Sequence, residues 1–233
     1  MATKFIPPTC SSDFALKPKT RLKLEALLRG TISFPDNGIC GILLHGTYGT
    51  GKTTMSKLLP GWLETAKTKK DLIYTPVDQI IDICATHYDF YPCAQGQNGT
   101  SLLNTIQSRA NLVSFQNSGL NYVVLDELDN LTDAAQSSLK AIMNFKHVVY
   151  IMTTNHLNKI DQGVINRSIT LDMDAAPTEV WVSKIHKDIQ KSGGGVMPAN
   201  AIQEIVEAGK GSCRTILTDI SIAQDLRTVE GKN

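Results

Sequence analysis

The stretch GTYGTGKT, at residues 46–53, constrains the fold of this 233-residue chain more than any other feature. Its glycines, its lysine and its final threonine fit the spacing G-x-x-x-x-G-K-[ST] of a phosphate-binding loop. Such a loop needs a strand before it and a helix after it. The apolar run ICGILLH (39–45) predicts a buried strand, and the residues from Lys52 to about Ala66 predict a helix.

A phosphate loop of this kind implies a nucleoside triphosphate as ligand. Its glycines let the backbone curl so that N–H groups face phosphate oxygens, and the following helix adds the positive pole of its dipole. On this interpretation Lys52 reaches the β- and γ-phosphates and Thr53 binds Mg²⁺. The alternative is a glycine-rich turn with a coincidental Lys–Thr pair. The predicted nucleotide-binding residues are Gly46, Thr47, Tyr48, Gly49, Thr50, Gly51, Lys52, Thr53 and Thr54.

A second motif, VVLDELD (123–129), predicts where the metal and the attacking water lie. Its apolar strand ends in Asp126, at the carboxyl edge of the sheet, where open α/β folds bind ligands. We expect Asp126 to hold Mg²⁺ through water, and Glu127 to orient or deprotonate the attacking water. The alternative is that Asp126 caps a helix and Glu127 is a surface carboxylate. Asp129 is a candidate for the cap of the next helix.

Further apolar runs, separated by helical patterns, indicate a parallel sheet with helices on both faces. Strands are predicted over 121–127, 147–155 and 168–173, and a helix over 133–144. Residues 71–100 predict one or two strands and a short helix at 77–87, and residues 101–115 predict another helix. The predicted class is an α/β fold: a P-loop three-layer αβα parallel sheet with a small C-terminal all-helical lid domain.

The chain changes character after Pro177, where only helical patterns remain, linked in part by SGGGVMP. We therefore predict a P-loop ATPase core over 1–175 and the helical lid domain over 176–233. Residues 1–20 contain three prolines and little periodicity, which predicts a flexible arm. An amphipathic helix is expected over 20–30.

Composition indicates the compartment in which the protein works more clearly than its function. The formal net charge is +1 and no charge block is present, so global charge gives no sign of a nucleic-acid partner. No apolar run approaches ~18 residues, no signal peptide opens the chain, and five widely spaced cysteines suit a reducing compartment. We expect a soluble cytoplasmic protein with no membrane partner, in the host cytoplasm if a phage encodes it. Zinc at Cys84, His87 and Cys93 would lack a fourth ligand, so free thiols are favoured.

The order of the motifs indicates an ATPase with an extra strand between the two motif strands, unlike kinases or GTPases. No N-K-x-D guanine-binding motif is present, which favours ATP over GTP. The run LDELDNLTDAAQSSLKAIMN, with VVYIMTTNHLNKIDQGVINRSITLDM after it, resembles the AAA+ ATPases, and most of all the small subunits of sliding-clamp loaders. The resemblance covers roughly residues 20–225. It implies an ATP-hydrolysing motor in DNA replication, a homo- or hetero-oligomer whose ATP sites are shared between subunits.

The resemblance assigns roles to further residues. Asn155, at the end of YIMTTN, would contact the attacking water or the γ-phosphate; the alternative is a simple strand terminator. Arg167, in INRS where the family has S-R-C, would reach the ATP of the neighbouring subunit, or else form a local ion pair. Arg214, in GSCR where the family prefers G-D-x-R, would contact the γ-phosphate of its own subunit. Gln136 would link its helix to its neighbours and to DNA, or be a solvated helix residue.

The resemblance also implies DNA, touched by helices that line the interior of a ring. Arg109 and Lys140 are the candidate phosphate contacts, although exposed cations occur on any helix. The sequence ends soon after the predicted lid and lacks the family's helical collar domain. Either the collar has been removed or the protein assembles differently, as would suit a phage, plasmid or mobile element.

Two rival functions stay open at the level of sequence. One is a helicase loader or a transposition-regulator ATPase that forms DNA-bound filaments. The other is a weakly hydrolysing, nucleotide-gated scaffold subunit, against which the intact Glu127 and Arg167 argue. A sliding clamp is the partner expected of a clamp loader, and a helicase that of a helicase loader.

Overall fold

The computed structural model describes residues 5–68, 76–93, 99–110, 112–145, 147–192 and 195–230. Within these ranges, one sheet of five parallel strands has the order β2-β3-β4-β1-β5. Its strands are β1 (Gly41–His45), β2 (Asp89–Pro92), β3 (Asn121–Asp126), β4 (Val148–Thr154) and β5 (Ser168–Asp172). Because β4 lies between β1 and β3, the extra strand predicted between the two motif strands is confirmed.

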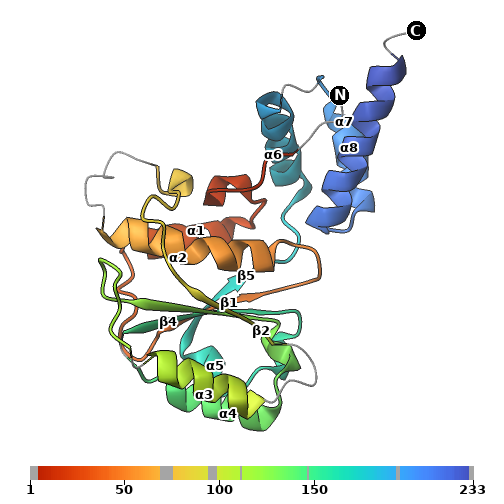
Figure 1. Cartoon of the computed structure of the whole chain (residues 1–233). Coiled ribbons are helices and arrows are strands. Elements are labelled where there is room, and N and C mark those ends of the chain that lie inside the picture. The colour runs from red at the N-terminus through yellow and green to blue at the C-terminus, as the bar shows by residue number, and fades with distance from the viewer. Residues whose placement is uncertain are drawn as a thin grey trace.

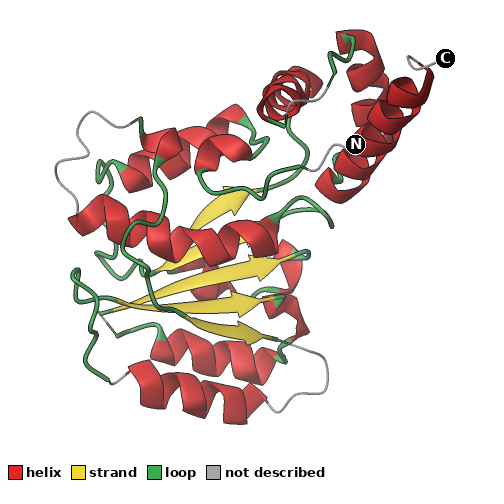
Figure 2. Ribbon diagram, turned by 45° about the horizontal axis from the view of Figure 1, so that its top comes forward, coloured by secondary structure: helices red, strands yellow, loops and turns green. Residues whose placement is uncertain are grey.

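Helices cover both faces of this sheet (Figures 1 and 2). On one face lie α1 (Pro18–Leu28) and α2 (Lys52–Thr68); on the other lie α3 (Gly99–Ala110), α4 (Asp133–Ile142) and α5 (Gln162–Asn166). Successive strand residues serve opposite layers, as the pleat requires: Val149 packs with α1 and α2, and Tyr150 packs with α3 and α4. The predicted three-layer αβα class is confirmed.

The strand register brings four segments together at the carboxyl edge of the sheet. His45, the last residue of β1, is opposite Thr154 of β4 and Asp172 of β5, and β3 ends nearby at Asp126. The phosphate loop begins at the next residue, Gly46. Parallel pairing therefore places the loop beside the polar ends of three other strands.

The last three helices form a separate layer, which we call the helical unit: α6 (Thr178–Lys191), α7 (Ala199–Ala208) and α8 (Cys213–Glu230). They enclose an apolar cluster of their own, distinct from the two that flank the sheet. Its buried members include Trp181, Ile185, Ile202, Ile216 and Ile220. This separate core is why we propose a domain boundary near residue 176. No helix in the described ranges has the length and apolar content needed to cross a membrane.

The flexible arm predicted over 1–20 is wrong for much of its described part. Phe14 and Leu16 are buried in the sheet core, and the Trp62 indole N–H donates to the Thr9 carbonyl at 2.8 Å. A single 3₁₀ turn, η1 (Ser11–Asp13), precedes α1. The segment has no periodicity because it is extended, and its apolar side chains are buried one by one rather than along a helical face.

Two helix predictions also need correction. Residues 77–87 contain only the 3₁₀ turn η3 (Val77–Gln79), and Ile81 and Ile83 are exposed. The Asp82 carboxylate accepts hydrogen bonds from the backbone N–H groups of Cys84 and Thr86, which stabilises a turn in competition with a helix. The helix predicted over 101–115 ends at Ala110.

Candidate functional site

The phosphate loop has the backbone that its glycines predict. Gly46, Gly49 and Gly51 have φ values of 141°, 76° and 93°, a region that L side chains rarely adopt. Lys52, the first residue of α2, is buried, and its ammonium donates to the Gly46 carbonyl at 2.8 Å and also to that of Thr47. Burial lowers the pKa of Lys52, and nearby carboxylates, Asp174 foremost, partly offset that effect.

The end of β3 supplies an acid directly across from the loop. The Thr53 hydroxyl lies 2.9 and 3.0 Å from the two oxygens of Asp126, and the Thr153 hydroxyl donates to the same carboxylate at 2.7 Å. Oxygen donors of this kind suit Mg²⁺. The predicted metal ligands Thr53 and Asp126 are therefore brought together, and their chemistry fits the ion. Thr153 was missed by sequence reasoning, although a polar residue in an apolar strand was the available signal.

Glu127 and Asn155 lie at the ends of adjacent strands, beside this pair. Glu127 is exposed, has a left-handed backbone with φ of 59°, and its carboxylate accepts from the Asn130 amide at 3.2 Å. The backbone N–H of Asn155 donates to Asp129 at 3.3 Å. Asp129 thus binds the end of β4 and does not cap the next helix, for which Thr132 supplies the cap. That capping prediction was wrong.

Arg214 joins the same site from the helical unit. It is the second residue of α8, and its backbone N–H lies 3.4 Å from the Gly49 carbonyl of the loop. Arg214, Asn155 and Glu127, together with the loop from Tyr48 to Thr54, line a cavity of about 340 Å³. Tyr48 also lies 3.0 Å from His156, measured from its hydroxyl to Nε2. The residues predicted to act within one subunit therefore converge.

Arg167 lies at the other end of the sheet. It directly follows α5, and its guanidinium donates to the Gly163 carbonyl at 3.1 Å, while its own carbonyl accepts from the N–H groups of Cys40 and Gly41. Five residues of strand separate this level from Gly46, which corresponds to about 16 Å at the usual rise. The structure does not bring Arg167 to the phosphate loop of its own chain.

Gln136 has a defined structural role. It is 1% exposed, so the solvated-helix alternative is wrong. Its amide donates to the carbonyls of Leu131 and Lys159, and its oxygen accepts from the Asp161 N–H at 2.7 Å. The link to neighbouring segments is as predicted, but contact with DNA is blocked by burial in this arrangement.

The two cations proposed for DNA are each paired with a carboxylate on the surface. Arg109 bonds to Asp89, and Lys140 lies 3.6 Å from Asp161. Among the residues described, Cys84 and Cys93 belong to no cluster of three groups that could hold a metal.

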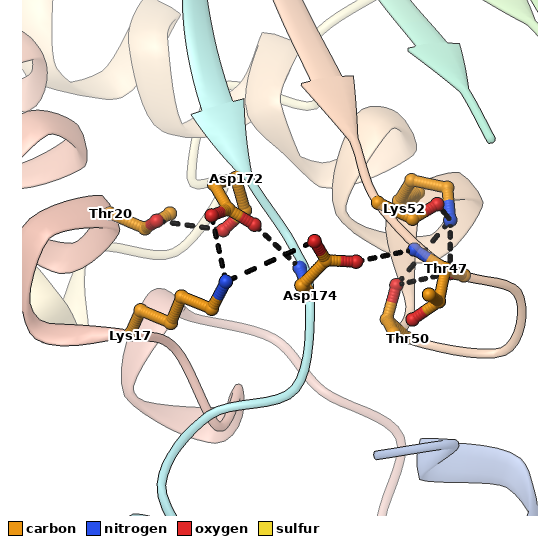
Figure 3. A network of polar contacts seen from close by, with 8 residues as sticks. Lys17, Thr20, Thr47, Thr50, Lys52, Asp172 and Asp174 are labelled. Atoms are coloured by element: carbon orange, nitrogen blue, oxygen red, sulfur yellow. Dashed lines mark hydrogen bonds and ion pairs between the residues drawn. The ribbon is translucent and has the colours of Figure 1, made fainter. Parts of the chain in front are cut away.

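Sequence reasoning missed two further parts of the site. A second cavity, of about 420 Å³, lies beside the loop residues Thr50 and Gly51 and is lined by the N-terminal segment 5–15 and by the helical unit. The absence of periodicity in that segment concealed it. The other part is Asp174, just after β5, whose carboxylate accepts from the Thr47 N–H at 2.7 Å (Figure 3).

Comparisons with known proteins agree with this geometry. Residues 42–171, more than half of the chain, match the family described as "ATPase family associated with various cellular activities (AAA)". Replication factor C small subunit 1 of Pyrobaculum islandicum is 23% identical over 195 residues, which cover 82% of this chain and 54% of the relative. Replication factor C subunit 4 of Caenorhabditis elegans is 21% identical, over 97% of this chain and 63% of the relative. The chain spans about half the length of the first of these relatives.

Among solved structures, a variant of RuvB from Thermotoga maritima superposes with a TM-score of 0.68 at 15% identity. The superposition covers 98% of this chain and 68% of that one. At this identity the likeness shows the fold alone.

Proposed function

Because the chain belongs to the ATPase family associated with various cellular activities (AAA), we propose that it binds and hydrolyses ATP with Mg²⁺ as one subunit of an oligomeric, clamp-loader-like motor in DNA replication. The relatives named replication factor C small subunit support the replication role. One observation carries the proposal: Thr53 of the loop and Asp126 of β3 lie 2.9 Å apart at the sheet edge where Lys52 is held.

The two adjoining cavities fit the two ends of ATP. The polar cavity along the loop, with Lys52 and Arg214, suits the triphosphate, because backbone N–H groups and cations favour its charge. The neighbouring cavity contains Phe14, Trp181 and Leu217, which offer apolar and aromatic surface to a base. Thr50 and Gly51 line both, so a nucleotide would pass from one to the other over the loop.

The chemistry follows from the positions at the strand ends. Thr53 and Asp126 would hold Mg²⁺, which would offset the charge of the phosphates when bound. Glu127 would accept a proton from the attacking water, and the Asn155 amide would orient that water or the γ-phosphate. Arg214 would contact the γ-phosphate from the helical unit, so that nucleotide state and the position of that unit are linked.

Arg167 would complete the site of a neighbouring subunit. Its backbone lies about 16 Å along the strand from its own loop, which argues for a role at the site of another subunit rather than at its own. A guanidinium neutralises the charge that spreads over a phosphoryl group during transfer. We propose that oligomerisation is for this reason a condition of hydrolysis.

DNA and a sliding clamp are the partners that we propose for this motor. Arg109 and Lys140 remain the candidate contacts to DNA. The loop after α3 carries the exposed apolar side chains of Leu112, Val113 and Phe115, which are 63%, 83% and 102% exposed. Exposed apolar side chains so close together are suited to a protein partner.

The experiment that tests this function is phosphate release with primed DNA, with a sliding clamp and with both, beside Glu127→Gln as the inactive reference. Stimulation that requires both partners supports the proposal. Stimulation by DNA alone, with filaments in negative-stain images, identifies a transposition regulator instead. Phosphate release no higher than that of Glu127→Gln under every condition contradicts the ATPase and leaves a nucleotide-gated scaffold.

A further inference from the structure

The connection between β5 and the helical unit, residues 173–177, crosses directly against the phosphate loop. The Met173 N–H donates to the His45 carbonyl at 2.7 Å, which continues the ladder between β5 and β1. A Cβ atom at Gly46 would lie 2.7 Å from the Asp174 nitrogen and 2.9 Å from the Met173 carbonyl carbon. The first glycine of the loop is therefore required by this crossing as well as by its own φ of 141°.

Asp174 ties the crossing to the loop by a charge-assisted hydrogen bond. Its carboxylate accepts from the Thr47 N–H at 2.7 Å, and its other oxygen lies 3.9 Å from the Lys17 ammonium (Figure 3). Lys17 also pairs with Asp172 at 2.8 Å, and the Asp174 N–H donates to Asp172 at 2.8 Å. Lys17 and Asp172 therefore both hold Asp174 in the orientation in which its carboxylate accepts the hydrogen bond from Thr47.

The same connection touches the helical unit on its far side. A Cβ atom at Gly211, two residues before α8, would lie 2.2 Å from the Cβ of Ala175. Ser212, the next residue, is close enough to the loop that its hydroxyl would lie 2.6 Å from a Cβ at Gly49. The two residues before Cys213 and Arg214 therefore contact the loop in two ways. Ser212 lies directly against Gly49, and Gly211 lies against Ala175, the neighbour of Asp174.

We propose that Asp174 is a positioning residue that couples the phosphate loop to the helical unit, so that a nucleotide bound by the loop also fixes the segment carrying Arg214. This inference rests on the proposed ATP-binding function. Because Asp174 is hydrogen-bonded to Thr47, a movement of the loop would also move residues 173–175. Ala175 packs against Gly211, so the start of α8 would move with this segment.

A purely electrostatic role for Asp174 makes a different prediction. Burial lowers the pKa of Lys52, and among the carboxylates that act in the opposite direction Asp174 has the largest effect. Removal of the charge alone would then account for any effect, and Asp174→Asn and Asp174→Ala would behave alike. Coupling through the hydrogen bond requires instead that Asn, which keeps an acceptor oxygen, largely rescues the defect seen with Ala.

The test is amide hydrogen exchange of the full-length protein, with and without a non-hydrolysable ATP analogue, together with steady-state ATPase kinetics. In the wild type we expect the analogue to protect both the loop and residues 213–220. In Asp174→Ala we expect loop protection to persist at saturation, protection of 213–220 to fall at least threefold, and kcat to fall about tenfold with KM within threefold. Asp174→Asn should retain most of both. Glu179→Gln, which removes an exposed carboxylate in the first turn of α6 and leaves the Thr47 bond, should resemble the wild type.

The outcomes separate the coupling from the ATPase itself. Full protection of 213–220 in Asp174→Ala, or equal defects in the Ala and Asn variants, would overturn the coupling and leave the proposed function intact. Absence of loop protection in the wild type would overturn both. If Asp174→Ala does not fold, Asp174→Ser replaces it, because the serine hydroxyl is one bond too short to reach Thr47 while the side chain remains small and polar. Wild-type behaviour of that variant would equally contradict the coupling.

Discussion

The two ends of the sheet differ in the parts of the proposed ATPase site that they carry. At the carboxyl ends of the strands, Lys52, Thr53, Asp126, Glu127 and Asn155 meet, and Arg214 joins them from the helical unit. At the amino end of β5, Arg167 is anchored on α5 with no nucleotide-binding loop of its own chain within reach. In the proposed motor, one chain would supply the residues at the carboxyl ends of the strands, and a neighbouring chain would supply Arg167.

The largest expected effect is the loss of ATP hydrolysis when Arg167 is replaced. In Arg167→Ala we expect the hydrolysis rate to fall about 10³-fold, the scale on which an arginine contributes to phosphoryl transfer. ATP affinity should stay within about twofold, because the binding half lies at the other end. A labelled-nucleotide titration and a phosphate-release assay measure the two quantities. Lost binding with normal turnover per bound ATP would contradict the assignment.

Replacing Lys52 should weaken ATP binding, which the Arg167 substitution is expected to leave nearly unchanged. Lys52→Ala removes a buried cation that faces the phosphates, and we expect ATP to bind about 100-fold more weakly, which corresponds to about 3 kcal/mol. Lys57→Ala is the matched control, since Lys57 lies on the same helix α2 but stacks over the Phe90 ring at 4.3 Å. Equal effects of the two substitutions on the titration would show that the loop lysine does not hold phosphate.

The contacts that hold the segment leading to Arg167 can be removed without changing Arg167 itself. Gln136 makes three hydrogen bonds to backbone groups, and two of them, to Lys159 and Asp161, fix the start of the segment that leads through α5 to Arg167. Gln136→Ala leaves those buried groups without partners, and we expect the free energy of unfolding to fall by about 3 kcal/mol. Urea denaturation measures this, with the exposed Ser138→Ala on the same helix as control. A change below about 0.5 kcal/mol would contradict the role assigned to this residue.

Replacing Asp13, which holds the N-terminal segment near the phosphate loop, should lower the free energy of unfolding by a smaller amount that depends on pH. Burial of Asp13 acts to raise its pKa, but hydrogen bonds from Thr9 and Cys10 and the contact with Lys191 outweigh it and lower the pKa to about 2. Because the folded pKa lies below the ordinary 3.8, the stability from ionised Asp13 is complete above about pH 4 and is lost as the pH falls toward 2. Asp13→Asn should therefore destabilise by about 2 kcal/mol at pH 7 and by progressively less below pH 4.

Urea unfolding of Asp13→Asn and of the wild type at pH 7 and at pH 2.5 measures that dependence. The N-terminal segment that Asp13 anchors lines the larger cavity, so a weaker anchor should also weaken ATP binding modestly. A difference in stability that does not change with pH would show that Asp13 is not the titrating group.

The carboxyl end could be predicted from sequence because its residues belong to compact motifs. The loop and the acids after β3 are contiguous, and parallel pairing alone brings them to one edge. Asp174 and Thr153 escaped prediction because their partners, Thr47 and Asp126, are far away in sequence and only the register of the strands reveals them. The packing of Phe14 was hidden because its segment shows no helical or strand periodicity.

Asp129 shows how local rules mislead at a functional edge. An acid near the start of a helix is a natural cap, but here a nearer threonine takes that position. Asp129 is left to bind the end of β4 beside Asn155. Local sequence could not rank these two partners, because one of them is supplied by a strand 25 residues further along the chain.

The most direct test of the shared site is to mix two inactive proteins, Arg167→Ala and Lys52→Ala, and to measure phosphate release. Each variant retains the half that the other lacks. In a random mixture, roughly a quarter of the sites pair an intact loop with an intact arginine across a head-to-tail interface. A site built from two chains predicts that activity reappears on mixing, to about that fraction of the wild type. A mixture no more active than its two components would contradict a site built from two chains.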